Sequence, residues 1–159
     1  MQHRIGIGYD VHQLREGIPM VLGGVTIPHN KGPLGHSDGD VLIHAICDAL
    51  LGATALGDIG QHFPDNSEEF RNIDSKILLE RTSGLIANEG FSIGNIDSTV
   101  CLQQPRISSH IPSMKKTLSG VLKIDEGQIS IKATTTEGLG IIGEGSAISA
   151  YAVALLKKA

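Results

Sequence analysis

The sequence predicts a single α+β domain in which helices cover one face of a mixed β-sheet. Three observations support this prediction. Segments of alternating apolar residues open and close the chain, segments with apolar residues at helical spacing lie between them, and no internal repeat or linker interrupts the order β-β-α-α-β-α-β-β. One domain over positions 1–159 also has an ordinary size.

The opening segment is predicted to be a strand with one apolar face. Apolar residues alternate with small or polar ones over residues 5–12, which places Asp10 and His12 together on the opposite face. Residues 20–28 are predicted to form a second strand that completes an opening hairpin. The Gly- and Pro-rich residues 30–35 are predicted to be a loop.

The first helix is predicted from apolar residues that recur at helical spacing over residues 38–56. Ser37 or Asp38 is the expected N-cap, and Gly57 the expected end. Residues 58–69 carry Gly, Pro and polar side chains without a period, which indicates a loop.

The middle of the chain is predicted to be helix, strand, helix. Asp74 is expected to cap a helix that ends near Gly90, and residues 91–102 alternate well enough for a strand. A third helix is expected over residues 109–123, with Pro112 in its first turn, where no amide hydrogen is needed.

Two strands are predicted to close the chain. Residues 128–136 are rich in β-branched side chains, and residues 138–145 form a loop with four glycines. Residues 148–156 fit either a strand or a helix, and we predict a strand.

Composition excludes several classes of function. The net charge of −4 leaves no basic stripe for a phosphate backbone, and three Phe, two Tyr and no Trp offer few rings for base stacking, so nucleic acid is not an expected partner. Residues 147–156 fall short of the roughly 20 residues of a membrane-spanning helix, and no export signal opens the chain. We therefore expect a cytoplasmic protein without a membrane partner. Cys47 and Cys101 are expected to be buried free thiols.

The sharpest chemical signal is Asp10-x-His12 together with His44. One carboxylate and two imidazoles give the three ligands of a catalytic zinc site, which keeps one position open; a capping Asp and two surface histidines are the alternative. Asp40 and Asp48 share the helix face of His44, so a carboxylate one turn away could orient its imidazole, although a solvated acidic face would look the same.

Two further segments suit phosphate. His36 precedes the first helix, whose exposed amides could receive an anion, although residues 36–40 also fit a plain capping sequence. Residues 134–136 are three threonines followed by Glu137, and their hydroxyls, amides and carboxylate could hold phosphate and a divalent ion. Threonine is also a common strand residue, so this segment has a structural alternative as well.

Four segments, in this order and at this spacing, carry a resemblance to a known family. They are residues 5–12 (IGIGYDVH), residues 36–41 (HSDGDV) with His44-Ala45, residues 57–60 (GDIG) with 63–65 (FPD), and residues 132–137 (KATTTE). Together they resemble the 2-C-methyl-D-erythritol 2,4-cyclodiphosphate synthase family over nearly the whole chain.

The resemblance implies a homotrimer with sheets around the threefold axis, helices outside and active sites between subunits. It implies the substrate 4-diphosphocytidyl-2-C-methyl-D-erythritol 2-phosphate, whose 2-phosphate attacks the β-phosphorus, closes a cyclic diphosphate and expels CMP. This reaction belongs to non-mevalonate isoprenoid precursor biosynthesis.

Residue roles follow from matching positions. The resemblance assigns Zn²⁺ to Asp10, His12 and His44. It implies that Glu137 helps to bind Mg²⁺ or Mn²⁺, and that His36 and Thr135 hold the reacting phosphates through the transition state.

The implied substrate contacts fall into three groups. Asp58 would accept hydrogen bonds from the polyol, residues 63–67 would form a loop against it, and residues 102–108 with Thr134 would hold cytidine. The full implied set is Asp10, His12, His36, Ser37, Asp58, Ile59, Gly60, Phe63, Pro64, Asp65, Asn66, Ser67, Leu102, Gln103, Gln104, Pro105, Arg106, Ile107, Ser108, Thr134, Thr135, Thr136, Glu137, Ile141 and Glu144.

Three positions depart from the family pattern. Arg106 stands where many members have Lys, which keeps the charge but changes the hydrogen-bond geometry. Ile141 and Glu144 stand where many members have Phe and Arg, and the Glu reverses the sign of the charge. A phosphate contact there, and an isoprenoid diphosphate in the trimer's central cavity, are therefore open questions.

Two other functions remain as alternatives. A zinc-dependent phosphoester hydrolase would use the same three ligands and open position. A trimeric metal-stabilised binding protein would keep the fold without catalysis.

Overall fold

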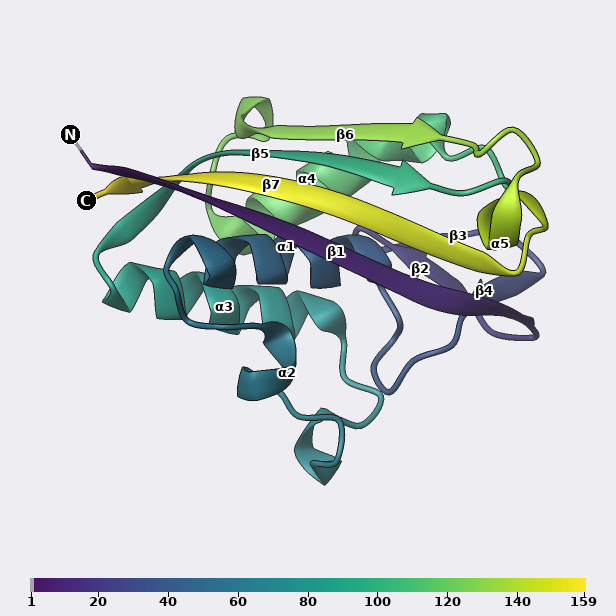
Figure 1. Cartoon of the computed structure of the whole chain (residues 1–159), viewed down its shortest axis with the longest axis horizontal. Coiled ribbons are helices and arrows are strands. Elements are labelled where there is room, and N and C mark those ends of the chain that lie inside the picture. Colours follow the sequence, from purple (N-terminus) through teal and green to yellow (C-terminus); the bar gives the residue numbers. More distant parts are fainter. Residues whose placement is uncertain (1) are drawn as a thin grey trace.

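A five-stranded mixed sheet forms one layer of the protein, and helices form the other (Figure 1). The computed structural model describes residues 2–159. The strand order is β4-β1-β7-β5-β6, in which β5 and β6 run parallel and the other neighbours run antiparallel. The strands are β1 (His3–Glu16), β4 (Lys31–Pro33), β5 (Phe91–Cys101), β6 (Ile129–Thr134) and β7 (Ala147–Lys158). The predicted α+β class, with helices on one face of a mixed sheet, is confirmed.

The two ends of the chain pair with each other. β1 and β7 are antiparallel from His3 opposite Lys157 to Gln13 opposite Ala147, so both termini lie at the same end of the sheet (Figure 1). β7 also pairs with β5 on its other side and therefore runs through the middle of the sheet. The strand predicted for residues 148–156 is confirmed, and a central position explains its nearly continuous apolar sequence.

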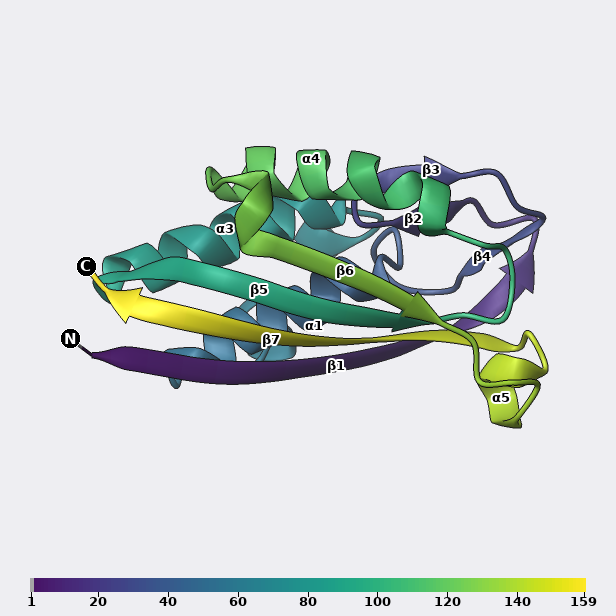
Figure 2. The ribbon, with the colours of Figure 1, turned by 90° about the horizontal axis from the view of Figure 1, so that it is seen from above.

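Three helices cover one face of the sheet, as Figure 2 shows. They are α1 (Val41–Ala53), α3 (Ser75–Asn88) and α4 (Ile111–Leu122). Pro112 lies in the first turn of α4, as predicted. The expected loops each contain a short helix, α2 (Ile59–His62) and α5 (Gly140–Gly143), and three 3₁₀ turns lie at Glu68–Phe70, Ser108–His110 and Glu126–Gln128.

The helix layer packs on the glycine face of β1. A Cβ atom on Gly6 would lie 1.9 Å from the carbonyl oxygen of Ala49, and one on Gly8 would lie 1.8 Å from that of Ala45. Both distances are too short for any side chain, so α1 approaches the strand backbone directly. This close contact sets the distance between β1 and α1, and hence between the side chains that each presents further along.

The other face of β1 and β7 is apolar and exposed. Ile5 and Ile7 are 71% and 70% exposed, and Tyr9 lies beside Tyr151 with ring centroids 4.8 Å apart. Val153 continues this surface on β7. α5 lies on the opposite side of the sheet from α4, at one end of the strands (Figure 2). An apolar surface of this kind is typical of a contact face.

The expected opening hairpin is wrong. Residues 20–28 form two short strands, β2 (Met20–Leu22) and β3 (Val25–Ile27), which pair with each other in a separate ribbon. Gly23 and Gly24, with φ of 58° and 73°, form the turn that breaks the predicted strand. The end of β1 pairs instead with β4, which lies inside the expected loop over residues 30–35.

The N-cap of α1 is Asp40 rather than Ser37 or Asp38. The Asp40 carboxylate is fully buried and accepts from the backbone N–H groups of Ile43 at 3.1 Å, Gly23 at 3.0 Å and Gly24 at 2.7 Å. It therefore joins the β2–β3 turn to the start of the helix. α1 ends at Ala53 with Thr54 as its C-cap, a few residues before the predicted end. Asp74 caps α3 as predicted.

The main core lies between α1 and the sheet. It includes Leu42, Ile46 and Leu50 of α1, all fully buried. Both cysteines are free, Cys47 buried as predicted and Cys101 half-buried. Within residues 2–159, the helices are too short or too polar to cross a lipid bilayer.

Candidate active site

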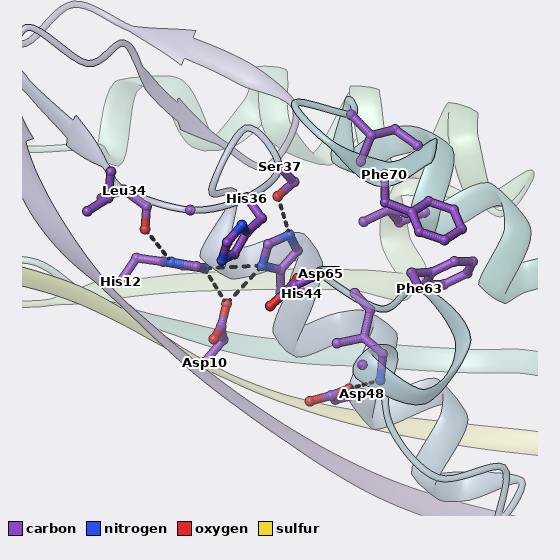
Figure 3. Close-up of a pocket in the computed structure, with 15 residues that line it drawn as sticks. Asp10, His12, Leu34, His36, Ser37, His44, Asp48, Phe63, Asp65 and Phe70 are labelled. Atoms are coloured by element: carbon purple, nitrogen blue, oxygen red, sulfur yellow. Dashed lines mark hydrogen bonds and ion pairs between the residues drawn. The ribbon is translucent and has the colours of Figure 1, made fainter. Parts of the chain in front are cut away.

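Asp10, His12 and His44 meet at one end of the contact between β1 and α1 (Figure 3). Asp10 and His12 follow the glycines on the same face of β1, and His44 lies on the first full turn of α1. One ligand atom from each residue lies within 4.8 Å of the other two. The structure therefore brings together the three residues predicted to bind a metal.

The potential ligand atoms of the three side chains converge. The Oδ2 atom of Asp10 lies 2.9 Å from Nε2 of His12 and 3.0 Å from Nδ1 of His44, and the two nitrogens are 3.2 Å apart. The remaining ring nitrogens point away: Nδ1 of His12 lies 2.9 Å from the carbonyl oxygen of Leu34, to which it can donate. Nε2 of His44 faces two hydroxyls, Ser37 Oγ at 3.1 Å and Ser75 Oγ at 3.0 Å.

The electrostatics of the cluster favour a charged carboxylate. Burial raises the pKa of Asp10, but hydrogen bonds from His12 and His44 outweigh it and lower the pKa to about 2. For His12 the opposite holds. Burial lowers its pKa, but the hydrogen bond and the attraction to Asp10 raise it by more, so the net shift is upward. Near neutral pH the Asp10 carboxylate is therefore negatively charged, and it lies beside ring nitrogens of His12 and His44.

This donor set fits a divalent metal. Nitrogen and carboxylate oxygen are the ligands of catalytic zinc, and three protein ligands leave one position for a substrate oxygen. The partners on the outer ring nitrogens strengthen the fit, because a ligating histidine usually donates its other N–H to an acceptor.

The expected role of Asp40 and Asp48 is wrong. Asp40 is buried against backbone amides, and Asp48 accepts from the N–H of Ile59 at 2.8 Å. Their alternative, a solvated acidic face, is also wrong, because Asp40 is fully buried. Within the described part of the chain, the hydroxyls of Ser37 and Ser75 contact Nε2 of His44, where a carboxylate was expected. Ser75 belongs to no motif and was missed, since only the three-dimensional packing of α3 brings it there.

The cluster opens into a cavity of about 520 Å³. Six further residues predicted to contact the substrate line it: His36, Ser37, Ile59, Gly60, Phe63 and Asp65. Phe70, Ile73 and Leu78, which sequence reasoning missed, add an apolar wall. Asp58 lies just outside the lining and caps α2 by accepting from the N–H of Gln61 at 3.0 Å. Pro64, Asn66 and Ser67 also lie outside the lining, on the exposed loop that follows.

A second cavity, of about 190 Å³, lies between the end of β6 and the segment after β5. The predicted cytidine-binding residues supply most of its lining: Leu102, Gln103, Pro105, Arg106, Ile107, Ser108 and Thr134. Thr135, predicted to hold phosphate, lines it as well. Gln104 lines a neighbouring hollow with His29. The structure thus groups the residues expected to hold a nucleotide.

The phosphate segment lies beside this second cavity. Thr135 Oγ1 donates to Glu137 Oε1 at 3.3 Å and accepts from the backbone N–H of Glu137 at 3.2 Å. Thr136 follows, with its hydroxyl bonded to the carbonyl oxygen of Leu139. Further along, Ile141 and Glu144 are exposed at α5, and Glu144 lines a hollow with Lys31.

Within one described chain, the two cavities share no lining residue. The three clustered ligands lie in the first, whereas Thr135 lies in the second, with Glu137 beside it. One chain therefore does not bring the predicted metal ligands and the predicted phosphate-binding Thr135 into one cavity.

Comparison with known proteins identifies relatives over the whole chain. The family model described as the YgbB family matches residues 3–157. The chain is 58% identical over 158 residues to 2-C-methyl-D-erythritol 2,4-cyclodiphosphate synthase of Bacteroides fragilis, covering 99% of each sequence. It is also 58% identical over 153 residues to the protein of the same name from Clostridium botulinum, covering 96% of this chain and 99% of the relative.

Solved structures agree. The bifunctional IspDF of Campylobacter jejuni superposes with a TM-score of 0.96 at 39% identity, covering 99% of this chain and 43% of that one. The CDP complex of IspF from Plasmodium falciparum superposes with a TM-score of 0.86 at 43% identity, covering 98% and 96% of the two chains.

Proposed function

Since the chain belongs to the YgbB family, we propose the following reaction for it. Like its relatives, the 2-C-methyl-D-erythritol 2,4-cyclodiphosphate synthases, it is an enzyme of the lyase class. The substrate is 4-diphosphocytidyl-2-C-methyl-D-erythritol 2-phosphate, and the products are 2-C-methyl-D-erythritol 2,4-cyclodiphosphate and CMP. The reaction would supply isoprenoid precursors by the non-mevalonate route, in the cytoplasm. The convergence of Asp10, His12 and His44 in a cavity large enough for a polyol phosphate supports the proposal most directly.

The proposed step is an intramolecular phosphoryl transfer. An oxygen of the 2-phosphate forms a new bond to the β-phosphorus. The bond from that phosphorus to the oxygen bridging it to the α-phosphorus breaks, and this oxygen leaves as part of CMP. Water is neither consumed nor released. Catalysis of such a transfer depends mainly on positioning and on neutralising charge.

Asp10, His12 and His44 would hold the metal, and we propose Zn²⁺. When bound, the ion would draw electron density from a phosphoryl oxygen. The protein's own part is to present one charged oxygen and two nitrogens with their lone pairs aimed at one point. The hydrogen bond from His12 Nδ1 to the carbonyl oxygen of Leu34 keeps that ring in position.

The walls of the metal cavity would bind the phosphorylated polyol. His36 is exposed at its mouth and can donate a hydrogen bond to a phosphate oxygen, and the hydroxyl of Ser37 lies beside it. Ile59 and Gly60 would contact the carbon skeleton, while Asp58, at the start of α2, would accept from its hydroxyls. The loop over residues 63–67 would close over the methylerythritol.

The second cavity would bind the nucleotide. Its lining combines apolar side chains, Leu102 and Ile107, with the hydroxyls of Ser108 and Thr134 and the charge of Arg106. The structure of the Plasmodium falciparum relative is a CDP complex, which supports a cytidine nucleotide as the ligand of this fold. Thr135 would hold the diphosphate, and Glu137 would help to bind a second ion, Mg²⁺ or Mn²⁺.

We further propose a homotrimer whose sheets surround a threefold axis. The exposed apolar face of β1 and β7 suits burial between subunits. The separation of the two cavities in one chain suits a site completed by a neighbour, with the metal cavity of one subunit beside the nucleotide cavity of the next. At the axis, the negative charge of Glu144 and the aliphatic Ile141 would weaken binding of an isoprenoid diphosphate.

Isotope incorporation tests the reaction class. A metal-bound hydroxide acting on a phosphoester would suit the same three ligands, so a hydrolase is the competing function. The reaction is run in ¹⁸O-labelled water, and the products are analysed by mass spectrometry. Cyclisation predicts products without solvent ¹⁸O, whereas label in the phosphate groups would establish hydrolysis and refute the proposal.

A further inference from the structure

A buried serine on α3 contacts His44 from the side opposite the proposed metal. Ser75 is the first residue of α3 and is fully buried. Its Oγ atom lies 3.0 Å from Nε2 of His44, while Nδ1 of the same ring faces Asp10 at 3.0 Å. The imidazole thus lies between the ligand cluster and this hydroxyl.

The hydroxyl of Ser75 donates its proton in a hydrogen bond to a carboxylate. Ser75 Oγ donates to Oδ1 of Asp38, and the other oxygen of that carboxylate accepts from the backbone N–H of Ser75 at 3.0 Å. A serine hydroxyl has one proton and two lone pairs. With the proton held by Asp38, only lone pairs remain for the imidazole, so Nε2 of His44 must be the donor.

This direction of donation determines the state of the other ring nitrogen. A metal-ligating imidazole is neutral and carries one proton, so a proton on Nε2 leaves the lone pair of Nδ1 for the metal, which takes the place of the proton shared with Asp10 in the metal-free cluster. That lone pair points toward Asp10 and His12. The arrangement matches His12, whose Nδ1 has the carbonyl oxygen of Leu34 as its acceptor.

Ser37 is the competing acceptor, because its Oγ lies 3.1 Å from the same nitrogen. Its surroundings differ from those of Ser75. Ser37 is only half-buried, and its Oγ accepts from the backbone N–H of Gly39 at 3.2 Å. Among the described residues, no carboxylate holds its proton, so the Ser37 hydroxyl is free to donate or accept.

We infer that Ser75, held by Asp38, is a positioning residue that fixes the tautomer and ring orientation of His44 for a divalent metal. The inference rests on the proposed metal centre and adds Ser75, which no sequence motif supplied. The chain of contacts from Asp38 through Ser75 to His44 also links the start of α3 to α1. Packing between these helices thereby reaches the metal ligands.

Metal affinity, measured without substrate, tests the inference. Metal-free wild type, Ser75→Ala, Ser37→Ala and Ser119→Ala proteins are titrated with Zn²⁺ in competition with a chromophoric chelator. Loss of a hydrogen-bond partner of a ligating histidine typically weakens metal binding about 10- to 100-fold, and we expect this for Ser75→Ala. Ser119→Ala is the matched control, because it removes a hydroxyl from a buried serine on α4 whose partner is the carbonyl oxygen of Lys116.

The outcomes separate the inference from the proposed function. Unchanged Zn²⁺ affinity in Ser75→Ala, with normal binding by wild type, overturns the role of Ser75. A loss in Ser37→Ala alone overturns it in favour of the other hydroxyl. Failure of wild type to bind Zn²⁺ refutes the metal centre itself, and the inference falls with it.

If the Ser75→Ala protein does not fold, a second measurement, on the wild-type protein, tests the inference. Proton NMR of the zinc-loaded protein reports the imidazole N–H of His44 directly. We expect an Nε2 proton that exchanges slowly with water and shows a nuclear Overhauser effect to the β-protons of Ser75. A rapidly exchanging Nε2 proton, or one near Ser37 only, contradicts the inference.

Discussion

His44 contributes one of the three atoms on which the proposed chemistry depends. Its Nδ1 atom lies 3.0 Å from Asp10 and 3.2 Å from Nε2 of His12, and the ring is half-buried rather than part of the core. We predict that His44→Ala removes zinc and activity together while the fold remains. Lewis-acid stabilisation of several kcal/mol corresponds to a loss of at least about 100-fold in kcat/KM.

Metal content, activity and circular dichroism of the purified variant check this prediction. His110→Ala, at the start of α4, is a suitable control because His110 lies outside the linings of both cavities. A zinc-free His44→Ala protein with full activity would show that the metal has no part in the reaction.

The buried thiol of Cys47 leads to a prediction about stability at alkaline pH. Burial in the core raises the pKa of this thiol from 9.0 to about 12. Between these values the unfolded chain has lost the proton and the folded chain has kept it, so the free energy of unfolding falls as pH rises, by about 1.4 kcal/mol per pH unit. Below pH 9 both states hold the proton, and Cys47 adds no pH dependence.

Denaturant unfolding of wild type and Cys47→Ala at several alkaline pH values isolates this effect. Other groups titrate in both proteins, so the difference between the two slopes belongs to Cys47. Parallel pH profiles for the two proteins would contradict the assignment.

At the scale of elements, the contact between β1 and α1 holds the site together. The glycine face of β1 brings α1 close enough for His44 to meet Asp10 and His12. A methyl group on Gly8 would clash with the carbonyl oxygen of Ala45, next to His44 in sequence. We predict that Gly8→Ala lowers the free energy of unfolding by about 3 kcal/mol and weakens Zn²⁺ binding as well.

Gly84→Ala is the control for this effect. Gly84 lies in α3, and an added Cβ would meet nothing within 4 Å. Alanine has the higher helix propensity, so this variant should gain up to about 1 kcal/mol. Chemical denaturation and zinc titration measure both variants, and a Gly8→Ala protein with wild-type zinc affinity would mean that the ligand geometry tolerates a displaced helix.

The long elements could be predicted from sequence, and the short ones could not. β1, β5, α1, α3 and α4 have enough apolar residues at a regular spacing to define a period, whereas the apolar sequence of β7 fits two periods and β2, β3 and β4 have three residues each. The cap of α1 was misplaced by two or three residues, because Asp40 is distinguished from Ser37 and Asp38 by its contacts with the β2–β3 turn. Those contacts join segments far apart in the sequence.

The candidate site was predictable to a similar degree. Motif residues on β1 and α1 were expected to share one metal, and the structure places them together. Ser75 could not be anticipated, because its role depends on how α3 packs beside α1. Nor does a motif indicate that Thr135 lines a different cavity from the three ligands within the same described chain.

At the scale of the whole molecule, the separation of the two cavities makes the assembly part of the proposed mechanism. His44→Ala chains keep an intact nucleotide cavity, and Thr135→Ala chains keep an intact metal cavity. If sites form between subunits, mixing the two inactive proteins should restore about a quarter of the wild-type rate, because one interface in four then combines two intact halves.

Unfolding and refolding the two variants together, followed by an activity assay and a measurement of mass, tests this prediction. The expected mass is three times 16.8 kDa. Each variant refolded alone is the control and should stay inactive. A mixed trimer without activity would mean that each chain builds its site alone.

The central claim is that this chain closes a cyclic diphosphate at a zinc centre, and ³¹P NMR tests it most directly. The purified protein is incubated with Zn²⁺, Mg²⁺ and 4-diphosphocytidyl-2-C-methyl-D-erythritol 2-phosphate. The account predicts two coupled resonances of a cyclic diphosphate that grow in step with CMP. Release of inorganic phosphate, or an unchanged spectrum from folded, zinc-loaded protein, would contradict it.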